Sequence, residues 1–309
     1  MDRFEAMSVL AAIVDGGSLS AAGRRLGMPL ATVSRKLADL EAHLGTRLIV
    51  RSTRRLELTD AGRDYLLACR QILELVDEAE RAAAGAYARV QGQLVVAAPV
   101  VFGRLHVLPL VSEFLEQHPD VDIQLRLGDR NVHLIEEHVD LALRIGTLPD
   151  SSFVATQLSA VHRTLCASPD YLERFGTPAS LDALDAHRCI RFDGLDPAGG
   201  WTFVDAHGDK RTVALRARLV VSTADAAIAA AERGFGLTRA LSYQVADALR
   251  DGRLVRVLAH TEPPPWPVSL IHPGQGRLPM KTRAFIDFAA PRLRDRLRDV
   301  LRLLDAPPR

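Results

Sequence analysis

Basic side chains are concentrated in one short part of the chain, between residues 24 and 55. Eight basic and two acidic residues lie there, whereas the whole 309-residue chain has a formal net charge of only +1. The basic residues are Arg24, Arg25, Arg35, Lys36, Arg47, Arg51, Arg54 and Arg55. Because guanidinium and ammonium groups bind phosphate oxygens, this local excess of positive charge predicts a polyanionic partner.

Patterns typical of catalysis give no comparable signal. The ten histidines are scattered, and none forms the close pair that a metal-binding helix requires. Gly234-Phe235-Gly236 lacks the rest of a dinucleotide-binding fingerprint, and neither a nucleophile elbow nor a phosphate-binding loop occurs. We therefore expect no catalytic residue, no metal site and no cofactor. An enzyme remains an alternative that steady turnover of a metabolite would reveal.

Three short helices are predicted to position the basic residues. The first, about residues 3–15, has an apolar face of Phe4, Met7, Leu10, Ala11 and Val14. Ser18 is a good N-cap for the second, which buries Leu19, Ala22 and Leu26 and ends at Gly27. The third, about residues 29–43, begins at Pro29 and has an apolar stripe of Leu30, Val33, Leu37, Leu40 and Leu44.

Two helices joined by a tight glycine turn predict a helix-turn-helix, whose second helix fits the major groove of DNA. We expect Thr32 and Arg35 to contact base edges, and Ser34 and Lys36 to contact phosphates. The other candidate DNA contacts on these helices are Ser18, Ser20, Arg24, Pro29 and Leu30.

A β-hairpin wing is predicted after the third helix. Two short apolar segments, residues 47–51 and 56–58, flank a polar tip. Its candidate DNA contacts are Arg51, Thr53, Arg54 and Arg55, which would bind phosphates or enter the minor groove. The alternative is a small helical bundle with a solvated basic face, but the ordered series of elements within sixty residues favours DNA binding.

The segments 18–27, 33–37, 40–45 and 58–62, with Arg47-Leu48 and Arg51, resemble the signature of the LysR-type transcriptional regulators. The resemblance implies an α/β protein with a winged helix-turn-helix at 1–58, a dimerising linker helix at 59–90 and a two-lobed, periplasmic-binding-protein-like effector domain at 91–309. It implies no enzymatic activity. Met28-Pro29-Leu30 stands where many members carry polar residues, which leaves the operator sequence open.

A long helix from a Thr59 cap to about Tyr87 is predicted to join the two parts. Its apolar residues alternate at spacings of four and three: Tyr65, Cys69, Ile72, Val76, Ala79, Ala83 and Ala86. Such a heptad seam predicts a coiled coil between two chains, and hence a homodimer or a dimer of dimers. The alternative is a helix packed on its own domain. Cys69 is expected to be a buried apolar residue rather than a redox sensor.

From about residue 93 the pattern changes to strands alternating with helices, which predicts parallel α/β sheets. Strands are expected at 94–98, 121–127, 139–145, 164–167, 219–221, 254–258 and 268–271, and helices at 105–117, 132–137, from Thr223, and through Phe285 and Phe288. The resemblance implies that the last unit returns to the first lobe. Lobe I would comprise about 93–163 and 266–301, and lobe II about 164–265.

A small-molecule effector is expected between the lobes, where strands end and helices begin. The candidate residues are Pro99, Val100, Val101, Phe102, Arg130, Arg144, Ser222 and Thr223. An arginine such as Arg144 could bind a carboxylate through two hydrogen bonds, and by analogy with the family a small organic acid is expected. Arg144 as a structural ion-pair partner and Ser222 as a helix cap are the alternatives.

The partners expected are therefore double-stranded DNA, a small-molecule effector, a second copy of the chain and, in addition, RNA polymerase. The charged start of the chain predicts no export signal, and no apolar stretch is long enough to span a membrane. Together with three widely spaced cysteines, this predicts a cytoplasmic location. A solute-binding protein for transport is a second alternative, which cell fractionation would separate.

Overall fold

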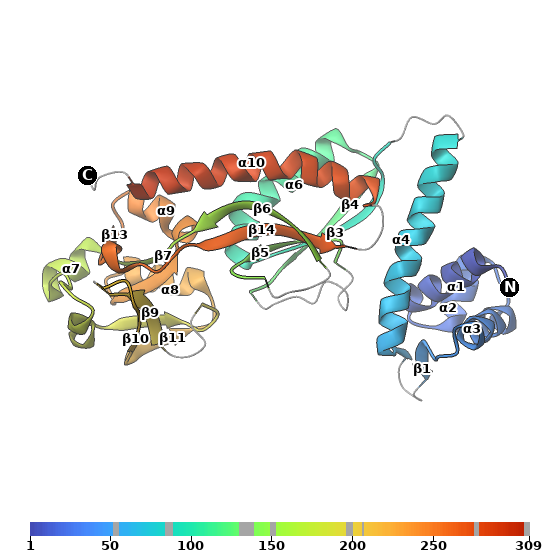
Figure 1. The fold of residues 1–309 in the computed structure, drawn as a ribbon, viewed down its shortest axis with the longest axis horizontal. Helices are drawn as coiled ribbons and strands as arrows, with labels where there is room; N and C mark the ends of the chain where they lie inside the picture. Colours follow the sequence, from blue (N-terminus) through green and yellow to red (C-terminus); the bar gives the residue numbers. More distant parts are fainter. Residues whose placement is uncertain are drawn as a thin grey trace.

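The computed structural model describes residues 1–51, 56–83, 89–129, 139–148, 153–195, 200–205, 207–274 and 278–305. A helical unit at the N-terminus is followed by the long helix α4 (Asp60–Ala83) and then by a larger unit built on two sheets (Figure 1). Four predictions fall outside the described residues: the helix at 132–137, Thr53-Arg54-Arg55, Arg130 and Ala86-Tyr87.

The N-terminal unit contains α1 (Arg3–Gly16), α2 (Leu19–Leu26), α3 (Leu30–Leu44), β1 (Ile49–Arg51) and β2 (Leu56–Leu58). Its core is formed mainly by Leu10 and Ile13 of α1 with Val33, Leu37 and Leu40 of α3. The predicted helices are present, but two predicted inward residues were wrong.

Phe4 is 50% exposed and Leu30 is 53% exposed. Asp2 caps α1 by accepting hydrogen bonds from the backbone N–H groups of Phe4 and Glu5, which places Phe4 in the first turn, beyond the packed part of the helix. Leu30 is likewise the first residue of α3. Helical spacing identifies a stripe but does not show how far along the helix the neighbouring helices extend.

Helix α4 is fixed to the N-terminal unit at its first turn. Thr59 caps it by accepting a hydrogen bond from Gly62 N–H at 2.9 Å, as predicted, and its hydroxyl donates to the Arg47 carbonyl at 2.7 Å. A Cβ at Gly62 would lie only 2.0 Å from the carbonyl oxygen of Leu48, so the backbones pass each other where only glycine fits.

The predicted heptad seam of α4 is divided between two roles. Cys69 is fully buried and Tyr65 half-buried, and both pack in the N-terminal core of the same chain. Their assignment to an interface between chains was therefore wrong. Further along, Ile72 is 37% exposed and Ala79 is exposed, so only the later part of the seam is open to a partner.

The first sheet, with its helices, forms lobe I and has the strand order β4-β3-β5-β14-β6. Its strands are β3 (Gly92–Ala98), β4 (Val121–Leu127), β5 (Leu141–Ile145), β6 (Phe153–Val161) and β14 (Trp266–Pro273). One continuous helical stretch follows β3: α5 (Val100–Phe102), a π-helical turn (Gly103–Val107) and α6 (Leu108–Gln117). The helix α10 (Met280–Asp305) covers β6 and extends along the whole two-sheet unit (Figure 1).

The second sheet forms lobe II and has the order β11-β8-β12-β7-β13. Its strands are β7 (Arg163–Ala167), β8 (Cys189–Phe192), β11 (Ala217–Val221), β12 (Leu237–Leu241) and β13 (Val255–Arg256). Its helices are α7 (Pro169–Phe175), α8 (Ala224–Glu232) and α9 (Ser242–Arg250), and a hairpin of β9 (Gly200–Val204) and β10 (Lys210–Ala214) is added to it.

The prediction of parallel sheets is confirmed only in part, because both sheets are mixed. In lobe I, β3 pairs in parallel with β4 and β5, but β14 runs antiparallel to β5 and β6. In lobe II, β12 is parallel to β8 and antiparallel to β7. Two segments of the chain cross between the lobes, at residues 161–163 and 262–266, and Trp266 of the second pairs with Val161 of the first.

Candidate functional site

The turn between α2 and α3 holds the two helices at a fixed angle. Ser18 caps α2 by accepting a hydrogen bond from Ala21 N–H at 3.1 Å, and Gly27 follows α2 in the left-handed conformation with φ of 65°. A Cβ at Gly23 would lie 2.7 Å from the Met28 carbonyl oxygen. This close approach of backbones fixes the start of α3, which is the helix expected to enter the major groove.

Most of the predicted DNA contacts on these helices lie on the molecular surface. Pro29, Leu30 and Arg35 are exposed at the N-terminal half of α3, while Thr32 and Ser34 are half-buried beside them. Ser20 and Arg24 are exposed on α2. A small polar and basic surface therefore surrounds the start of α3, where side chains of a recognition helix reach base edges. Ser18 differs from these residues, since its hydroxyl is already used as a cap.

Lys36 does not have the surroundings predicted for a phosphate contact. Its ammonium forms an ion pair with the Glu5 carboxylate of α1, and its side chain is only 22% exposed. The structure thus gives Lys36 a role in holding α3 against α1.

The wing is attached to the recognition helix by one carboxylate. Glu41 Oε1 accepts hydrogen bonds from the backbone N–H groups of Leu48 at 2.8 Å and Ile49 at 3.1 Å. Strands β1 and β2 pair antiparallel, with Ile49 opposite Leu58. The hairpin predicted from the sequence is therefore present up to its tip. The backbone of Arg51 lies in β1, and the side chains of Arg51, Thr53, Arg54 and Arg55 lie outside what the structure describes.

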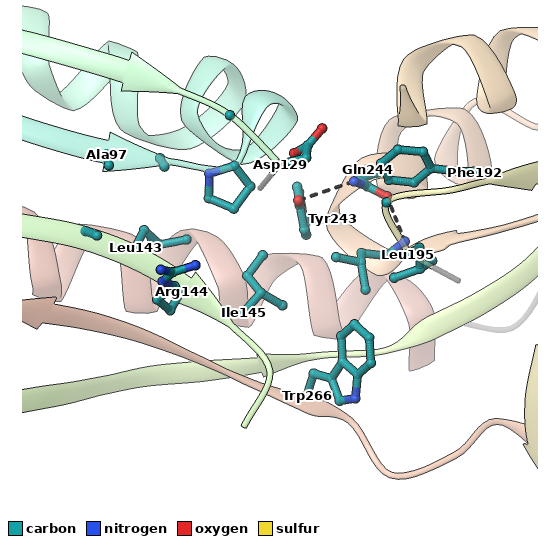
Figure 2. A pocket seen from close by; sticks show the side chains of 16 residues that line it. Ala97, Asp129, Leu143, Arg144, Ile145, Phe192, Leu195, Tyr243, Gln244 and Trp266 are labelled. Atoms are coloured by element: carbon teal, nitrogen blue, oxygen red, sulfur yellow. Dashed lines mark hydrogen bonds between the residues drawn. The ribbon is translucent and has the colours of Figure 1, made fainter. Parts of the chain in front are cut away.

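A pocket lies between the two lobes of the C-terminal unit (Figure 2). The centres of water-sized molecules can occupy about 110 Å³ of it, which is room for several waters or a compact solute. Lobe I contributes the ends of β3 and β4 and the length of β5: Ala97, Ala98, Pro99, Gly128, Asp129, Ala142, Leu143, Arg144 and Ile145. Lobe II and the crossing strand contribute Phe192, Gly194, Leu195, Leu241, Tyr243, Gln244 and Trp266.

The polar side chains of the pocket come from both lobes. Arg144 lies on β5 and Asp129 follows β4. From lobe II, Gln244 Nε2 donates to the hydroxyl of Tyr243 at 3.3 Å, and Gln244 Oε1 accepts from Leu241 N–H at 2.8 Å (Figure 2). Both polar ends of Gln244 are thus used to hold the start of α9 and to orient the Tyr243 hydroxyl.

Two of the predicted effector contacts line the pocket, namely Pro99 and Arg144. Val101 and Phe102 do not, because both are buried in the core of the C-terminal unit. The backbone N–H of Val100 is already bonded to Asp129 Oδ1 at 3.1 Å.

Ser222 and Thr223 lie at the start of α8, as predicted, but outside the pocket. Both residues are exposed, and the Thr223 hydroxyl accepts a hydrogen bond from Ala226 N–H at 3.4 Å. Thr223 therefore serves as the helix cap, whereas the alternative considered for this helix start was Ser222 as the cap.

The lobe II side of the pocket was missed by sequence analysis. Phe192 is the last residue of β8 and Leu195 follows that strand, while Tyr243 and Gln244 follow β12; neither strand was predicted. The rule that ligands bind at the carboxyl ends of strands would have located these residues once the strands themselves were recognised.

An aromatic contact behind the pocket joins the lobes. The His106 ring lies 4.8 Å from the Phe102 ring and 5.7 Å from the Tyr243 ring, between centroids. Burial of the imidazole, together with the charge of Arg296, lowers the pKa of His106 to about 4. His106 is therefore neutral near pH 7 and packs as an aromatic side chain.

The three cysteines are unsuited to thiolate chemistry. All are buried, and burial raises the pKa of Cys69 to about 11 and those of Cys166 and Cys189 to about 12. Cys166 and Cys189 lie opposite successive residues of β12, Thr238 and Leu237, so they face opposite sides of the sheet. Within the described residues, no group of three or more potential ligands could hold a metal ion.

In the described part of the chain, no helix is both long enough and apolar enough to cross a bilayer.

Comparisons with known proteins match both parts of the chain. Residues 4–63 match the bacterial regulatory helix-turn-helix of the LysR family, and residues 88–294 match the LysR substrate-binding domain. The chain is 34% identical to a transcriptional regulator of Xanthomonas campestris over 91% of this chain and 83% of that protein. It is 32% identical to a transcriptional repressor of Pseudomonas aeruginosa over 93% of this chain and 91% of that protein.

A solved structure shows the same architecture. CrgA of Neisseria meningitidis, a LysR-type regulator, matches with a TM-score of 0.61 and 29% identity over 94% of this chain and 98% of that chain. These proteins are regulators rather than enzymes. The helix-turn-helix, the interlobe pocket and the two family matches together place this chain in the LysR family of transcriptional regulators, which bind DNA and respond to small-molecule effectors.

Proposed function

We propose that the chain works as a dimer, or a dimer of dimers, that places two copies of α3 in successive major grooves of a two-fold-related DNA site. The exposed start of α3 carries this proposal, because Thr32 and Arg35 lie there, where side chains of a recognition helix reach base edges. Thr32 and Arg35 contact base edges, while Ser34 and the arginines of the wing bind phosphates. The chain acts where the DNA is, in the cytoplasm.

Dimerisation uses the part of α4 that its own N-terminal unit leaves uncovered. Ile72 and Ala79 are exposed and Val76 is half-buried, and their spacing of four and three residues forms a narrow seam. Two chains joined along this seam would present two recognition helices to two half-sites.

The effector is a small organic acid that binds in the interlobe pocket. Arg144 lies in its wall, and a guanidinium binds a carboxylate through two parallel hydrogen bonds. Because the lining comes from both lobes, a bound acid would favour one angle between them. The lobes would then change the position of the DNA-binding units through α4 and the contacts that α10 makes with it.

Selection of bound fragments from genomic DNA, followed by measurement of their dissociation constants, tests the DNA-binding mode. Arg35→Ala should weaken binding to the selected site by about 1–3 kcal/mol and relax its sequence preference at one position of each half-site. Ala42→Ser, a change at an exposed residue near the other end of α3, is the matched control. Equal effects of the two substitutions would remove the start of α3 from base recognition.

A further inference from the structure

The interlobe pocket contains two opposite charges in different parts of its wall. Among the described lining residues, the ionised side chains are Arg144 on β5 and Asp129 after β4. Figure 2 shows Asp129 on the side of Tyr243 and Gln244, and Arg144 beside Leu143 and Ile145. A ligand with a carboxylate alone would match Arg144 but would add a second negative charge to a pocket that already holds the Asp129 carboxylate.

Asp129 also occupies the place where an anion would otherwise bind. Its Oδ1 accepts the hydrogen bond from Val100 N–H, at the first turn of the helical stretch 100–117. The positive end of this helix therefore already has a carboxylate beside it. A ligand carboxylate is directed instead to Arg144, and the remaining electron pairs of Asp129, which is exposed, are open to a proton donor, best a cationic one.

Tyr243 adds a hydrogen-bond donor to the Asp129 side of the pocket. Its hydroxyl oxygen accepts from Gln244 Nε2 at 3.3 Å, so its own hydrogen remains for an acceptor. Burial, and to a smaller extent the charge of Asp129, raises the pKa of Tyr243, which therefore stays protonated.

The rest of the lining is mainly apolar. Ile145, Leu195, Leu241, Phe192 and Trp266 provide aliphatic and aromatic surface from both lobes. A ligand that fills this space carries a hydrocarbon or aromatic group in addition to its charged groups.

Taking the pocket as the effector site proposed above, we infer that it selects a neutral amino acid with an apolar side chain. The carboxylate binds Arg144, the ammonium binds Asp129, and the side chain packs against the apolar lining. Each charge of the ligand is then paired with an opposite charge of the pocket, and the ligand adds no net charge to it.

Matched ligand pairs test this inference on the full-length chain by isothermal titration calorimetry. Alanine, valine, leucine and phenylalanine are each compared with the acid of the same skeleton that lacks the amino group, for example leucine with 4-methylpentanoate. At least one amino acid should bind about tenfold or more tightly than its partner acid, which is the range for a charge-assisted hydrogen bond.

Asp129→Asn should abolish this preference while leaving the acid bound, because the Asn amide oxygen can still accept from Val100 N–H. Asp122→Asn, at an exposed residue of the preceding strand β4, is the control that should leave the ratio unchanged. Binding of the acids at least as tightly as the amino acids, or an unchanged ratio in Asp129→Asn, would overturn the inference but leave Arg144 as an acid-binding residue. Absence of binding by both members of every pair would overturn the inference together with the proposed acid site.

Discussion

At the scale of single residues, Glu41 connects the recognition helix to the wing. Its carboxylate accepts hydrogen bonds from the backbone N–H groups of Leu48 and Ile49, and Leu48 is fully buried. Glu41→Ala should lower the free energy of unfolding by about 1–3 kcal/mol, because a buried donor loses its partner. Urea denaturation of the full-length chain measures this loss.

Asp39→Ala on the same helix provides the comparison, since Asp39 is exposed and its removal should change stability by less than about 0.5 kcal/mol. Glu41→Gln, which keeps one acceptor oxygen, should restore most of the loss. A Glu41→Ala variant as stable as Asp39→Ala would show that water replaces the carboxylate.

His106 makes the stability of the C-terminal unit depend on pH. Burial lowers its pKa from 6.5 to about 4 in the folded chain, so the unfolded chain binds more protons between these values. Stability therefore falls as pH decreases through this range, by about 1–2 kcal/mol between pH 7 and pH 5. The charge of Arg296 opposes protonation of His106 and that of Asp247 favours it, and the pKa of about 4 includes both effects.

Unfolding experiments at pH 7 and pH 5 on the native chain and on His106→Gln measure this dependence. Between pH 7 and pH 5 the free energy of unfolding should fall by about 1–2 kcal/mol less in His106→Gln than in the native chain. If both proteins respond equally to pH, His106 is not the group responsible.

At the scale of secondary-structure elements, the wing and the recognition helix divide the work of DNA binding. Arg54→Ala combined with Arg55→Ala should weaken binding to all DNA sequences and flatten the dependence of the dissociation constant on salt, because fewer counterions are released. Fluorescence anisotropy with one selected and one random duplex at several salt concentrations checks this. An unchanged slope would remove these two arginines from phosphate binding.

Elements with strict periodicity were predictable from the sequence, and strands with mixed composition were not. Helices α1 to α3 and strands β3 and β4 have clear apolar patterns. Strand β12 includes Thr238 and Arg239, which normally indicate a surface, yet both are buried. Arg239 is accommodated because its guanidinium donates to the Thr202 carbonyl at 2.8 Å and lies near the rings of Trp201 and Phe203.

The same limit explains which half of the pocket was found. Arg144 lies on a strand whose pattern is apolar and Pro99 directly follows another, whereas Tyr243 and Gln244 follow β12. A residue such as Trp266 reaches the pocket only because β14 returns to lobe I, and no local pattern shows this pairing. Family resemblance supplied the two-lobed plan, and packing decided which side chains face the ligand.

At the scale of the whole molecule, α10 contacts both the linker helix α4 and the second lobe. Its first turn holds Lys281, whose Nζ lies 2.7 Å from Glu74 Oε1 of α4, and both side chains are largely buried. Near its other end, the Leu304 carbonyl accepts a hydrogen bond from Arg256 of β13 in lobe II. One helix thus contacts both the linker helix and the second lobe, a path along which the proposed effector response would reach the DNA-binding unit.

A double-mutant cycle with Lys281→Met and Glu74→Gln should give a coupling energy of about 0.5–3 kcal/mol in thermal unfolding. Lys281→Met alone should cost more than Glu74→Gln, because Asp140 also faces the Lys281 charge. The exposed pair of Arg283 and Asp287 on the same helix should show almost no coupling. Equal coupling energies for the two pairs would mean that α4 and α10 are not held together by Lys281.

The return of β14 to lobe I has a consequence for synthesis on the ribosome. Lobe I lacks the strand between β5 and β6 until residues 266–273 have been translated, by which time every strand of lobe II has already been made. The nascent chain can therefore complete its second lobe before its first, which reverses the usual order of folding from the N-terminus. Until then, the edges of β5 and β6 need protection from other nascent chains.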